Sequence, residues 1–316
     1  MKIVALSIQK GGVGKTTTAV NLGACVALAG KRVLILDLDP QANATSHLGV
    51  EPDANPSIYR ALSGEKTVAD LVIDTKYQNL SIIPAEKDLA GAEVELAKLD
   101  NHMTWLRDLL HGFRETAQYD FLLIDCPPSL GILMTSALAA ADEILVPLQC
   151  EYFGLEGLAQ VVEVTERIRE SGVNPTLRIE GIVLTMADSR TNLTDAVIND
   201  VRNTFEETAY ETVIPRSVRL SEAPSFKKTI NDYAPQSKGA LAYVALSMEF
   251  LKRHKEAEAQ ASAAPFAEAA PSSDAPSIAE AAPSSEAAPA AEATPATDDA
   301  TASTEPSPRS ESMPST

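Results

Sequence analysis

A glycine-rich segment between a short apolar run and a helix pattern constrains this chain more than any other feature of its sequence. Residues 9–16 read QKGGVGKT, after the apolar run at 3–8 and before a helix expected over residues 16–29. A strand, a glycine-rich turn and a helix in this order are the context that a phosphate-binding loop requires. The segment therefore predicts a loop that binds the phosphates of a nucleotide.

Individual residues of this loop have distinct chemical tasks. Gly11, Gly12 and Gly14 allow backbone N–H groups to converge on phosphate oxygens, and the start of the helix adds a partial positive charge. We expect Lys15 to reach the β- and γ-phosphates and the Thr16 hydroxyl to ligate Mg²⁺. ATP and magnesium are the expected ligands, and the alternative is a glycine turn with a chance lysine.

The first 255 residues alternate short apolar runs with amphipathic helix patterns. Strands are expected at 2–8, 32–37, 80–83, 120–125, 142–147 and 178–186. Helices are expected at 16–29, 85–97, 102–114, 130–140, 155–171, 192–207 and 237–253. The alternation predicts one α/β domain over residues 1–255, doubly wound, with a mostly parallel sheet and helices on both faces.

The remaining residues, 256–316, consist mainly of Ala, Pro, Ser, Thr and acids. They hold eleven acidic residues and one arginine, a net charge of −10 out of −18 for the chain, which leaves −8 for residues 1–255. Because large apolar side chains are few, we expect this tail to be disordered. A solubilising spacer and a docking segment for a partner are both compatible with its composition.

The cysteines and the first residues indicate a cytoplasmic protein. Cys25, Cys126 and Cys150 have no paired spacing, which argues against a disulfide framework or a zinc site. Residues 1–8 lack the features of a signal peptide, and no apolar run approaches about 18 residues. We therefore expect reduced thiols and no membrane span. Cys126 is interpreted as a packed thiol, with an iron–sulfur ligand as the alternative.

Three aspartates follow apolar runs that we expect to be strands. Asp37 ends the run at 33–36, Asp39 lies two residues later, and Asp125 ends the run at 121–124. Carboxylates are ligands that Mg²⁺ accepts directly or through its water shell. We expect Asp37 and Asp125 near the metal together with Thr16, and a capping role is the alternative for each aspartate.

The loop departs from the common pattern G-x-x-x-x-G-K-[ST], because Gln9 replaces the first glycine and an extra lysine, Lys10, follows it. Residues 10–17, with DLDPQ at 37–41, resemble the ParA/MinD branch of deviant Walker ATPases. Further segments resemble chromosomal, Soj-type ParA proteins: IDCPPSLG at 124–131, QCEYF at 149–153, RTN at 190–192 and IPRSVRLSEAPS at 214–225. The resemblance covers residues 1–253 and leaves out the tail.

The resemblance assigns roles to individual residues. It implies that Lys10 crosses a homodimer interface to the partner's ATP and that Asp39 positions the attacking water. Lys10, Lys15 and Asp39 are then the expected catalytic residues, with a solvated neighbour of the loop as the alternative for Lys10. Besides the glycines and Lys15, the expected nucleotide contacts are Val13, Thr16, Thr17 and Pro215.

The same resemblance leaves a choice between DNA and membrane. MinD-type members carry a basic amphipathic helix for lipid, whereas FLKRHK at 250–255 precedes an acidic segment that anionic lipid would repel. Residues 211–238 hold five basic and three acidic residues. Together with the family motifs, they indicate that Arg190, Arg216 and Arg219 contact DNA without sequence specificity; solvated arginines are the alternative.

The sequence therefore predicts a ParA-type ATPase that partitions chromosome origins. An ATP-dependent homodimer would bind nucleoid DNA, and a ParB-like centromere-binding partner would stimulate the slow hydrolysis that releases it. One alternative is a ParA-like ATPase that positions a plasmid or another cargo. The other is a nucleotide-switched scaffold that regulates a replication or division protein.

Overall fold

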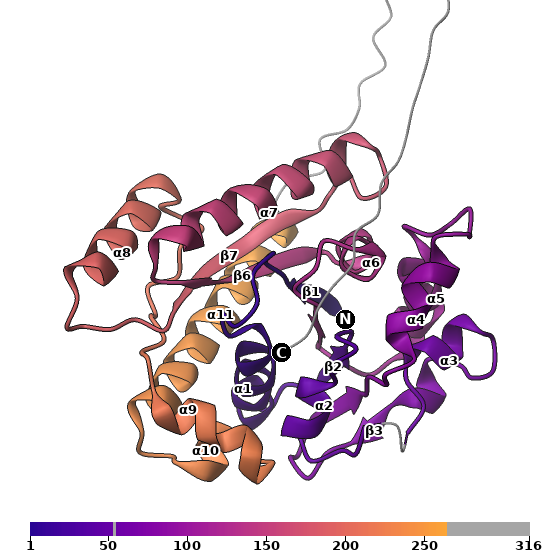
Figure 1. The fold of residues 1–316 in the computed structure, drawn as a ribbon, viewed down its shortest axis with the longest axis horizontal. Coiled ribbons are helices and arrows are strands. Elements are labelled where there is room, and N and C mark those ends of the chain that lie inside the picture. The colour runs from indigo at the N-terminus through magenta and orange to yellow at the C-terminus, as the bar shows by residue number, and fades with distance from the viewer. Residues whose placement is uncertain (53–54, 264–316) are drawn as a thin grey trace, which may run out of the picture. The chain divides into compact units, whose positions relative to one another are not determined.

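Seven strands form one sheet in the computed structural model, which describes residues 1–52 and 55–263 (Figure 1). All neighbouring strands are parallel except β3 and β4. In sheet order the strands are β3 (Ile73–Asp74), β4 (Leu80–Ile83), β2 (Val33–Asp37), β5 (Phe121–Asp125), β1 (Lys2–Leu6), β6 (Glu143–Gln149) and β7 (Arg178–Thr185).

Helices connect the strands and cover both faces of the sheet (Figure 1). The α-helices are α1 (Lys15–Leu28), α2 (Asn43–His47), α3 (Ile58–Leu62), α4 (Leu89–Leu96), α5 (Trp105–Thr116), α6 (Ile132–Ala140), α7 (Tyr152–Glu170), α8 (Asn192–Thr204), α9 (Val218–Glu222), α10 (Ile230–Tyr233) and α11 (Lys238–Ala263). Two short 3₁₀ helices are η1 (Ala69–Leu71) and η2 (Ala223–Phe226).

The alternation of side chains along β1 explains the two covered faces. Ile3 and Ala5 belong to an apolar cluster that includes residues of α4 to α8. Val4 and Leu6 belong to a second cluster that includes residues of α1, α10 and α11. Parallel strands buried on both faces read as continuous apolar runs, and the central strands have that character. The predicted fold class, a doubly wound and mostly parallel sheet, is confirmed.

The six predicted strands and seven predicted helices all form, and most lie close to their expected limits; α4 begins four residues late and α11 ends well beyond its expected end. The sequence did not indicate β3 or the short helices α2, α3, α9 and α10, because elements of two to five residues are too short to show a period.

Helix α11 extends further than the sequence predicted. It runs to Ala263, ten residues beyond the expected end at residue 253, and so includes the first eight residues assigned to the tail. Residues 254–263 read HKEAEAQASA, and Ala, Glu, Lys and Gln are strong helix formers. The rest of the predicted tail lies outside the described residues, and the domain boundary stays a prediction.

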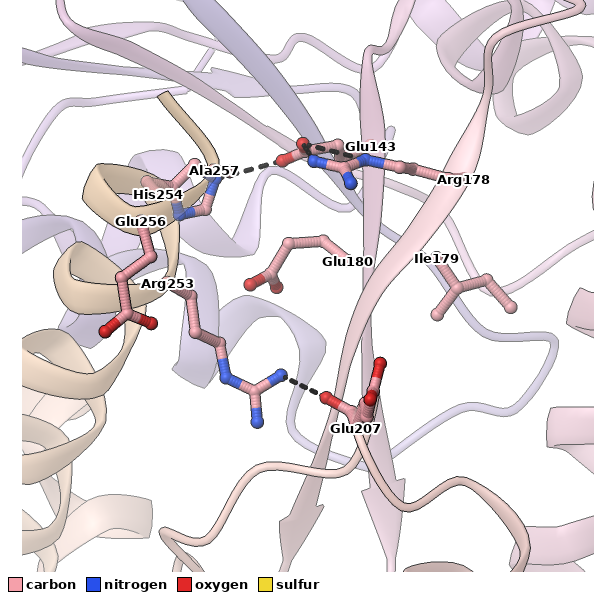
Figure 2. Close-up of a pocket in the computed structure, with 9 residues that line it drawn as sticks. All are labelled: Glu143, Arg178, Ile179, Glu180, Glu207, Arg253, His254, Glu256 and Ala257. Carbon is pink, nitrogen blue, oxygen red and sulfur yellow. Dashed lines mark hydrogen bonds and ion pairs between the residues drawn. The ribbon is translucent and has the colours of Figure 1, made fainter. Parts of the chain in front are cut away.

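A buried ionic cluster holds the end of α11 against the sheet (Figure 2). Glu143, at the start of β6 and 1% exposed, accepts hydrogen bonds from Lys2 at 3.0 Å and from Arg178 of β7, and lies 2.9 Å from His254 of α11. Burial opposes ionisation of Glu143, but the hydrogen bonds from His254 and Arg178 outweigh it and lower the pKa of Glu143 to about 2. Burial alone would lower the pKa of His254, but its contact with Glu143 raises it.

A cavity of about 210 Å³ adjoins this cluster, and charged side chains form most of its lining (Figure 2). Arg253 donates to the carbonyl oxygens of Glu207 at 3.1 Å and Ala209 at 2.7 Å. Glu180 accepts a hydrogen bond from the Tyr210 hydroxyl at 2.6 Å. The cavity lies where β6 and β7 begin, whereas the glycine-rich loop follows the end of β1. We interpret it as a structural junction between α11 and the sheet.

Candidate nucleotide-binding site

The glycine-rich loop joins the end of β1 to the start of α1, and its backbone requires glycine at two positions. The φ angle is +75° at Gly12 and +94° at Gly14, conformations that residues with a Cβ rarely adopt. A Cβ placed at Gly11, Gly12 or Gly14 would meet no other atom within 4 Å. The space beside these glycines is therefore open to a ligand.

Two side chains hold the loop in shape. The Lys15 ammonium donates to the carbonyl oxygen of Lys10 at 2.9 Å and to that of Ile8 at 3.4 Å. The hydroxyl of Thr185, the last residue of β7, donates to the carbonyl oxygen of Val13 at 2.8 Å. The loop is thus tied both to its own first residues and to a strand at the far side of β6.

Asp125 is a buried acid with free oxygens. It ends β5, is 0% exposed, and neither carboxylate oxygen has a hydrogen-bond partner among the described residues. Burial and the neighbouring Asp37 raise the pKa of Asp125 well above its ordinary range, and the Thr16 hydroxyl opposes that shift. Burial also lowers the pKa of Lys15, and the charge of Asp125 offsets part of that lowering. A buried carboxylate in this state is costly unless a cation approaches it.

Asp37, by contrast, already has partners on both oxygens. One accepts hydrogen bonds from the Thr45 N–H at 2.8 Å and hydroxyl at 2.7 Å, and the other faces the Asp39 N–H at 3.3 Å. Burial nevertheless raises the pKa of Asp37 to about 6. The sequence placed Asp37 near the metal, and the oxygen that faces the Asp39 N–H is the less occupied of the two. Its metal role stays a prediction.

Asp39 lies in the turn after β2 and is 8% exposed. Its Oδ1 accepts a hydrogen bond from the Gln41 N–H at 2.9 Å, as a capping residue does. The turn closes at Ala42, whose φ of +52° is unusual for a residue with a Cβ and is a mark of local strain. The charge of Asp39 also reaches Lys15, whose pKa it raises against the effect of burial. Asp39 therefore combines a structural cap with a position close to the phosphate loop.

A pocket of about 530 Å³ lies beside the first turn of α1. Its volume falls within the range of roughly 300–1,000 Å³ for small-ligand sites. Its lining includes Gly14, Thr17, Met186, Ile214, Pro215 and Tyr243. Its mostly apolar walls next to a phosphate loop suit a nucleobase. Pro215, which the sequence placed at the nucleotide, is one of these residues.

Backbone hydrogen bonds attach the segment around Pro215 to the end of β7. The Ile214 N–H donates to the carbonyl oxygen of Leu184 at 2.8 Å, and the Arg216 N–H donates to that of Ala187 at 2.9 Å. This attachment brings residues 214–218 next to the loop after β1, from which they are far removed in sequence.

The extra lysine of the loop, Lys10, faces the start of α7. Its ammonium lies 3.9 Å from Oε2 of Glu151, and Arg216 lies 3.5 Å from Oε1 of the same carboxylate. The Gln149 side-chain amide donates to Oε1 at 2.7 Å. Glu151 therefore lies between the phosphate loop and the segment that lines the pocket.

The three arginines predicted to contact DNA each pair with an acid of the same chain. Their side chains are more than half exposed, and Arg190 is 83% exposed. Arg190 lowers the pKa of Asp188 through hydrogen bonds, and Arg216 adds to that effect. Arg216 also lines the pocket, which the sequence did not indicate. The pairs are Arg190 with Asp188, Arg216 with Glu151 and Arg219 with Glu222.

Sequence reasoning missed three residues of this site. Thr185 and Met186 carry no recognisable motif, although Met186 has a φ of +53° beside the pocket. Glu151 stands within the segment QCEYF at 149–153, but nothing in the sequence connected it to Lys10. Only the packing of β7 and α7 against the loop brings them together.

The residues present suit a phosphate ligand accompanied by a hydrated divalent cation. The loop N–H groups, the start of α1 and Lys15 favour an anion. Asp125 and the Thr16 hydroxyl offer the oxygen ligands that Mg²⁺ prefers. In the described part of the chain, no three His, Cys, Asp or Glu side chains lie close enough to hold a metal by themselves. A cation would thus depend on oxygens of the bound phosphate.

Two further sequence expectations concern the chain as a whole. Cys25, Cys126 and Cys150 are free and buried, and burial raises the pKa of the Cys126 thiol. Over residues 1–52 and 55–263, none of the helices has both the length and the apolar character for crossing a membrane.

Comparisons of the sequence find close relatives over most of its length. Residues 1–179 match the AAA domain family. The chain is 49% identical over 253 residues to the chromosome partitioning protein ParA of Myxococcus xanthus, covering 80% of this chain and 88% of the relative. It is 50% identical over 249 residues to the sporulation initiation inhibitor protein Soj of Bacillus subtilis, covering 78% and 97%.

Solved structures with the same fold include two at moderate sequence identity. The cobyrinic acid a,c-diamide synthase of Mycobacterium smegmatis, solved with ADP and magnesium, is 34% identical with a TM-score of 0.70, covering 81% of this chain and 96% of that one. The cell division ATPase MinD of Pyrococcus furiosus is 28% identical with a TM-score of 0.65, covering 79% and 98%.

Proposed function

Because this chain belongs to the ParA/Soj family of chromosome-partitioning proteins, we propose that it is a magnesium-dependent ATPase that partitions chromosome origins. Its ATP-bound homodimer would bind double-stranded DNA nonspecifically, and hydrolysis would release that DNA. The observation that supports the nucleotide site most strongly is the buried carboxylate of Asp125, without partners among the described residues, close to Thr16 and to the open glycine loop.

Binding of ATP would exchange hydrogen bonds that the loop now makes with itself. Lys15 would leave the carbonyl oxygen of Lys10 for the β- and γ-phosphates, and the N–H groups of the glycine loop would take the remaining phosphate oxygens. Asp125 and Thr16 would hold the water shell or an inner position of Mg²⁺. Mg²⁺, when bound, would supply positive charge against the phosphates.

Hydrolysis would use residues from both subunits. Asp39 would orient the attacking water, and Lys10 of each subunit would reach the phosphates held by the other, where negative charge spreads in the transition state. The present position of Asp39, near Lys15 and 8% exposed, supports a task at the phosphates. The turnover would be slow until the partner acts.

The arginine pairs support DNA binding that depends strongly on salt. On binding DNA, the three arginines would leave their acidic partners in the same chain for DNA phosphates. Each of them (Arg190, Arg216 and Arg219) would exchange one ion pair for another, so a single subunit would gain little binding free energy. A dimer presents twice as many such groups along one duplex. Nucleotide-dependent dimerisation would thereby control DNA affinity, and a ParB-like centromere-binding partner that stimulates hydrolysis would set the time of release. We place the protein in the cytoplasm, on the nucleoid.

The end of α11 argues against a membrane-binding role. Of its basic residues, Arg253 donates to backbone carbonyl oxygens of the segment after α8, and His254 contacts the buried Glu143. These two side chains are therefore engaged within the domain, and Lys252 lies 3.9 Å from Glu256, which weakens a basic face for lipid.

A binding assay with full-length protein tests this function. We expect DNA binding with Mg-ATP, weak binding with ADP or no nucleotide, and a steep decrease as salt rises. Anionic liposomes measured in parallel should not bind. Equal DNA binding in all nucleotide states, or binding to liposomes alone, would overturn the proposal.

A second candidate is a nucleotide-switched regulatory scaffold, which the name of the Bacillus subtilis relative, a sporulation initiation inhibitor, supports. In a scaffold the bound state matters and turnover does not. Replacing Asp39→Asn in cells distinguishes the two candidates, because a scaffold should keep its function, whereas partition of chromosomes or of any other cargo should fail.

A further inference from the structure

One carboxylate contacts both a residue of the phosphate loop and a residue of the pocket. Glu151, at the start of α7, faces Lys10 through Oε2 at 3.9 Å and Arg216 through Oε1 at 3.5 Å. Gln149 fixes the orientation of the carboxylate by donating to Oε1 at 2.7 Å. The side chains of Lys10 and Glu151 are 29% and 45% exposed, so the pair lies at the rim of the site and is free to separate.

Lys10 is held at both ends by groups of its own subunit. Its carbonyl oxygen accepts from Lys15 at 2.9 Å, and its ammonium faces Glu151. Phosphate binding would remove the first contact, because Lys15 turns to the phosphates. The second contact is not part of that exchange, because the Lys10 side chain makes it at the rim of the site.

The geometry points to Glu151 as a positioning residue that restrains Lys10 in the free subunit and thereby opposes dimerisation. This inference rests on the proposed function, in which Lys10 must leave its own subunit and enter the partner's site. Lys10 is released when the phosphates of a second subunit offer it a stronger anion than Glu151.

Arg216 makes this restraint reversible. After Lys10 leaves and until Arg216 turns to DNA, Glu151 has the guanidinium 3.5 Å away, so its charge is not left without a partner. The release of Lys10 consequently costs less than breaking an isolated pair. The same contact links the state of the phosphate loop to one of the arginines proposed to bind DNA.

The test compares Glu151→Gln with a matched control, Glu156→Gln. Glu156 is exposed on the same helix, and its replacement changes the net charge equally. An exposed ion pair shifts an equilibrium by about 1.5- to fivefold, and one dimer releases two such pairs. With Mg²⁺ and a nonhydrolysable ATP analogue, Glu151→Gln should therefore form dimers at about a two- to twentyfold lower protein concentration in sedimentation equilibrium. Glu156→Gln should match the parent, and the difference should fade in high salt.

A double-mutant cycle shows whether the effect acts through Lys10. In a Lys10→Gln background, Glu151→Gln should change the dimer dissociation constant little, and Glu151→Asp alone should stay closer to the parent than Glu151→Gln. Unchanged or weaker dimerisation of Glu151→Gln, or a full effect without Lys10, would overturn the inference. A parent protein that binds the analogue but never dimerises would instead contradict the proposed function.

Discussion

Asp37 and Asp125 are paired residues at the carboxyl ends of adjacent parallel strands, and both carboxylates are fully buried. Their environments nevertheless differ. Asp37 is bonded to Thr45, whereas both oxygens of Asp125 lack partners among the described residues. The strand register thus places a satisfied acid next to an unsatisfied one, and the unsatisfied acid is the one available to a cation.

Replacing Asp125→Asn should make the nucleotide-free protein more stable. The change removes an acid whose ionised form burial and Asp37 disfavour in the folded state, so we expect a gain of about 1 kcal/mol, or roughly 2–4 °C in Tm. The variant should lose the further stabilisation that Mg-ATP gives the parent, about 2.7 kcal/mol at a hundredfold excess over Kd. Thermal unfolding with and without Mg-ATP measures both effects.

The neighbouring change Asp37→Asn is the control for that experiment. The amide oxygen of Asn can still accept both bonds from Thr45, but its NH2 group then faces the Asp39 N–H, a donor against a donor, so the change should destabilise the protein by about 1–3 kcal/mol. An equal loss of stability in both variants would mean that Asp125 is bonded as well as Asp37 is, and would contradict the predicted gain for Asp125→Asn.

Two substitutions at Asp39 separate its structural role in the turn from its proposed role in ATP hydrolysis. Asp39→Ala removes the acceptor for the Gln41 N–H and should lower stability by about 1 kcal/mol. The same change should also abolish ATP hydrolysis. Asp39→Asn retains an acceptor oxygen, so its stability should stay near that of the parent while ATP turnover falls by at least about a hundredfold. Calorimetry and phosphate release report the two quantities. Normal turnover by Asp39→Asn would rule out the assigned role.

Adjacent glycines of the loop should respond differently to alanine. Gly12→Ala forces a φ of +75° on a residue with a Cβ and should cost about 1–2 kcal/mol of stability. Gly11 has no positive φ, and an added Cβ meets no atom within 4 Å, so Gly11→Ala should be nearly neutral in the nucleotide-free protein. Both methyl groups would occupy space meant for phosphates, so ATP affinity should fall in both. Unimpaired ATP binding by Gly11→Ala would place the phosphates elsewhere.

The cluster at the end of α11 should give stability a pH dependence. The pKa of His254 is raised above 6.5, so its contribution is complete below that value and is lost as pH rises through the folded pKa. The pKa of Glu143 is lowered from 4.5 to about 2, so its contribution is lost as pH falls from 4.5 toward 2. His254→Gln should therefore cost most between pH 4.5 and 6.5, about 2 kcal/mol, and progressively less as pH rises through the raised pKa of His254.

Urea unfolding across pH measures that difference. His111, 77% exposed on α5, supplies the control, and His111→Gln should change stability by less than about 0.5 kcal/mol at any pH. A cost of His254→Gln that is the same at every pH would mean that the imidazole contributes by packing alone.

The strands and the loop could be predicted because their signals are local. Apolar runs ending in Asp37 and Asp125, and glycines followed by Lys15, need only neighbouring residues to be recognised. The pocket could not be predicted, since it arises where the segment around Pro215 attaches to β7. The contact of Glu151 with Lys10 could not be predicted either, because it also depends on tertiary packing. The end of α11 was misjudged because alanine and glutamate are common both in helices and in unstructured tails.

Lys15 donates to the carbonyl oxygens of Lys10 and Ile8, so groups of the chain itself hold the loop in its shape. Bound phosphates would only have to draw the ammonium group away from these oxygens. A ligand arriving at such a loop loses little free energy to ordering it. We therefore expect the rate of ATP association to be set by encounter and by the movement of one lysine side chain, and the slow steps of the proposed cycle to be the association and dissociation of subunits.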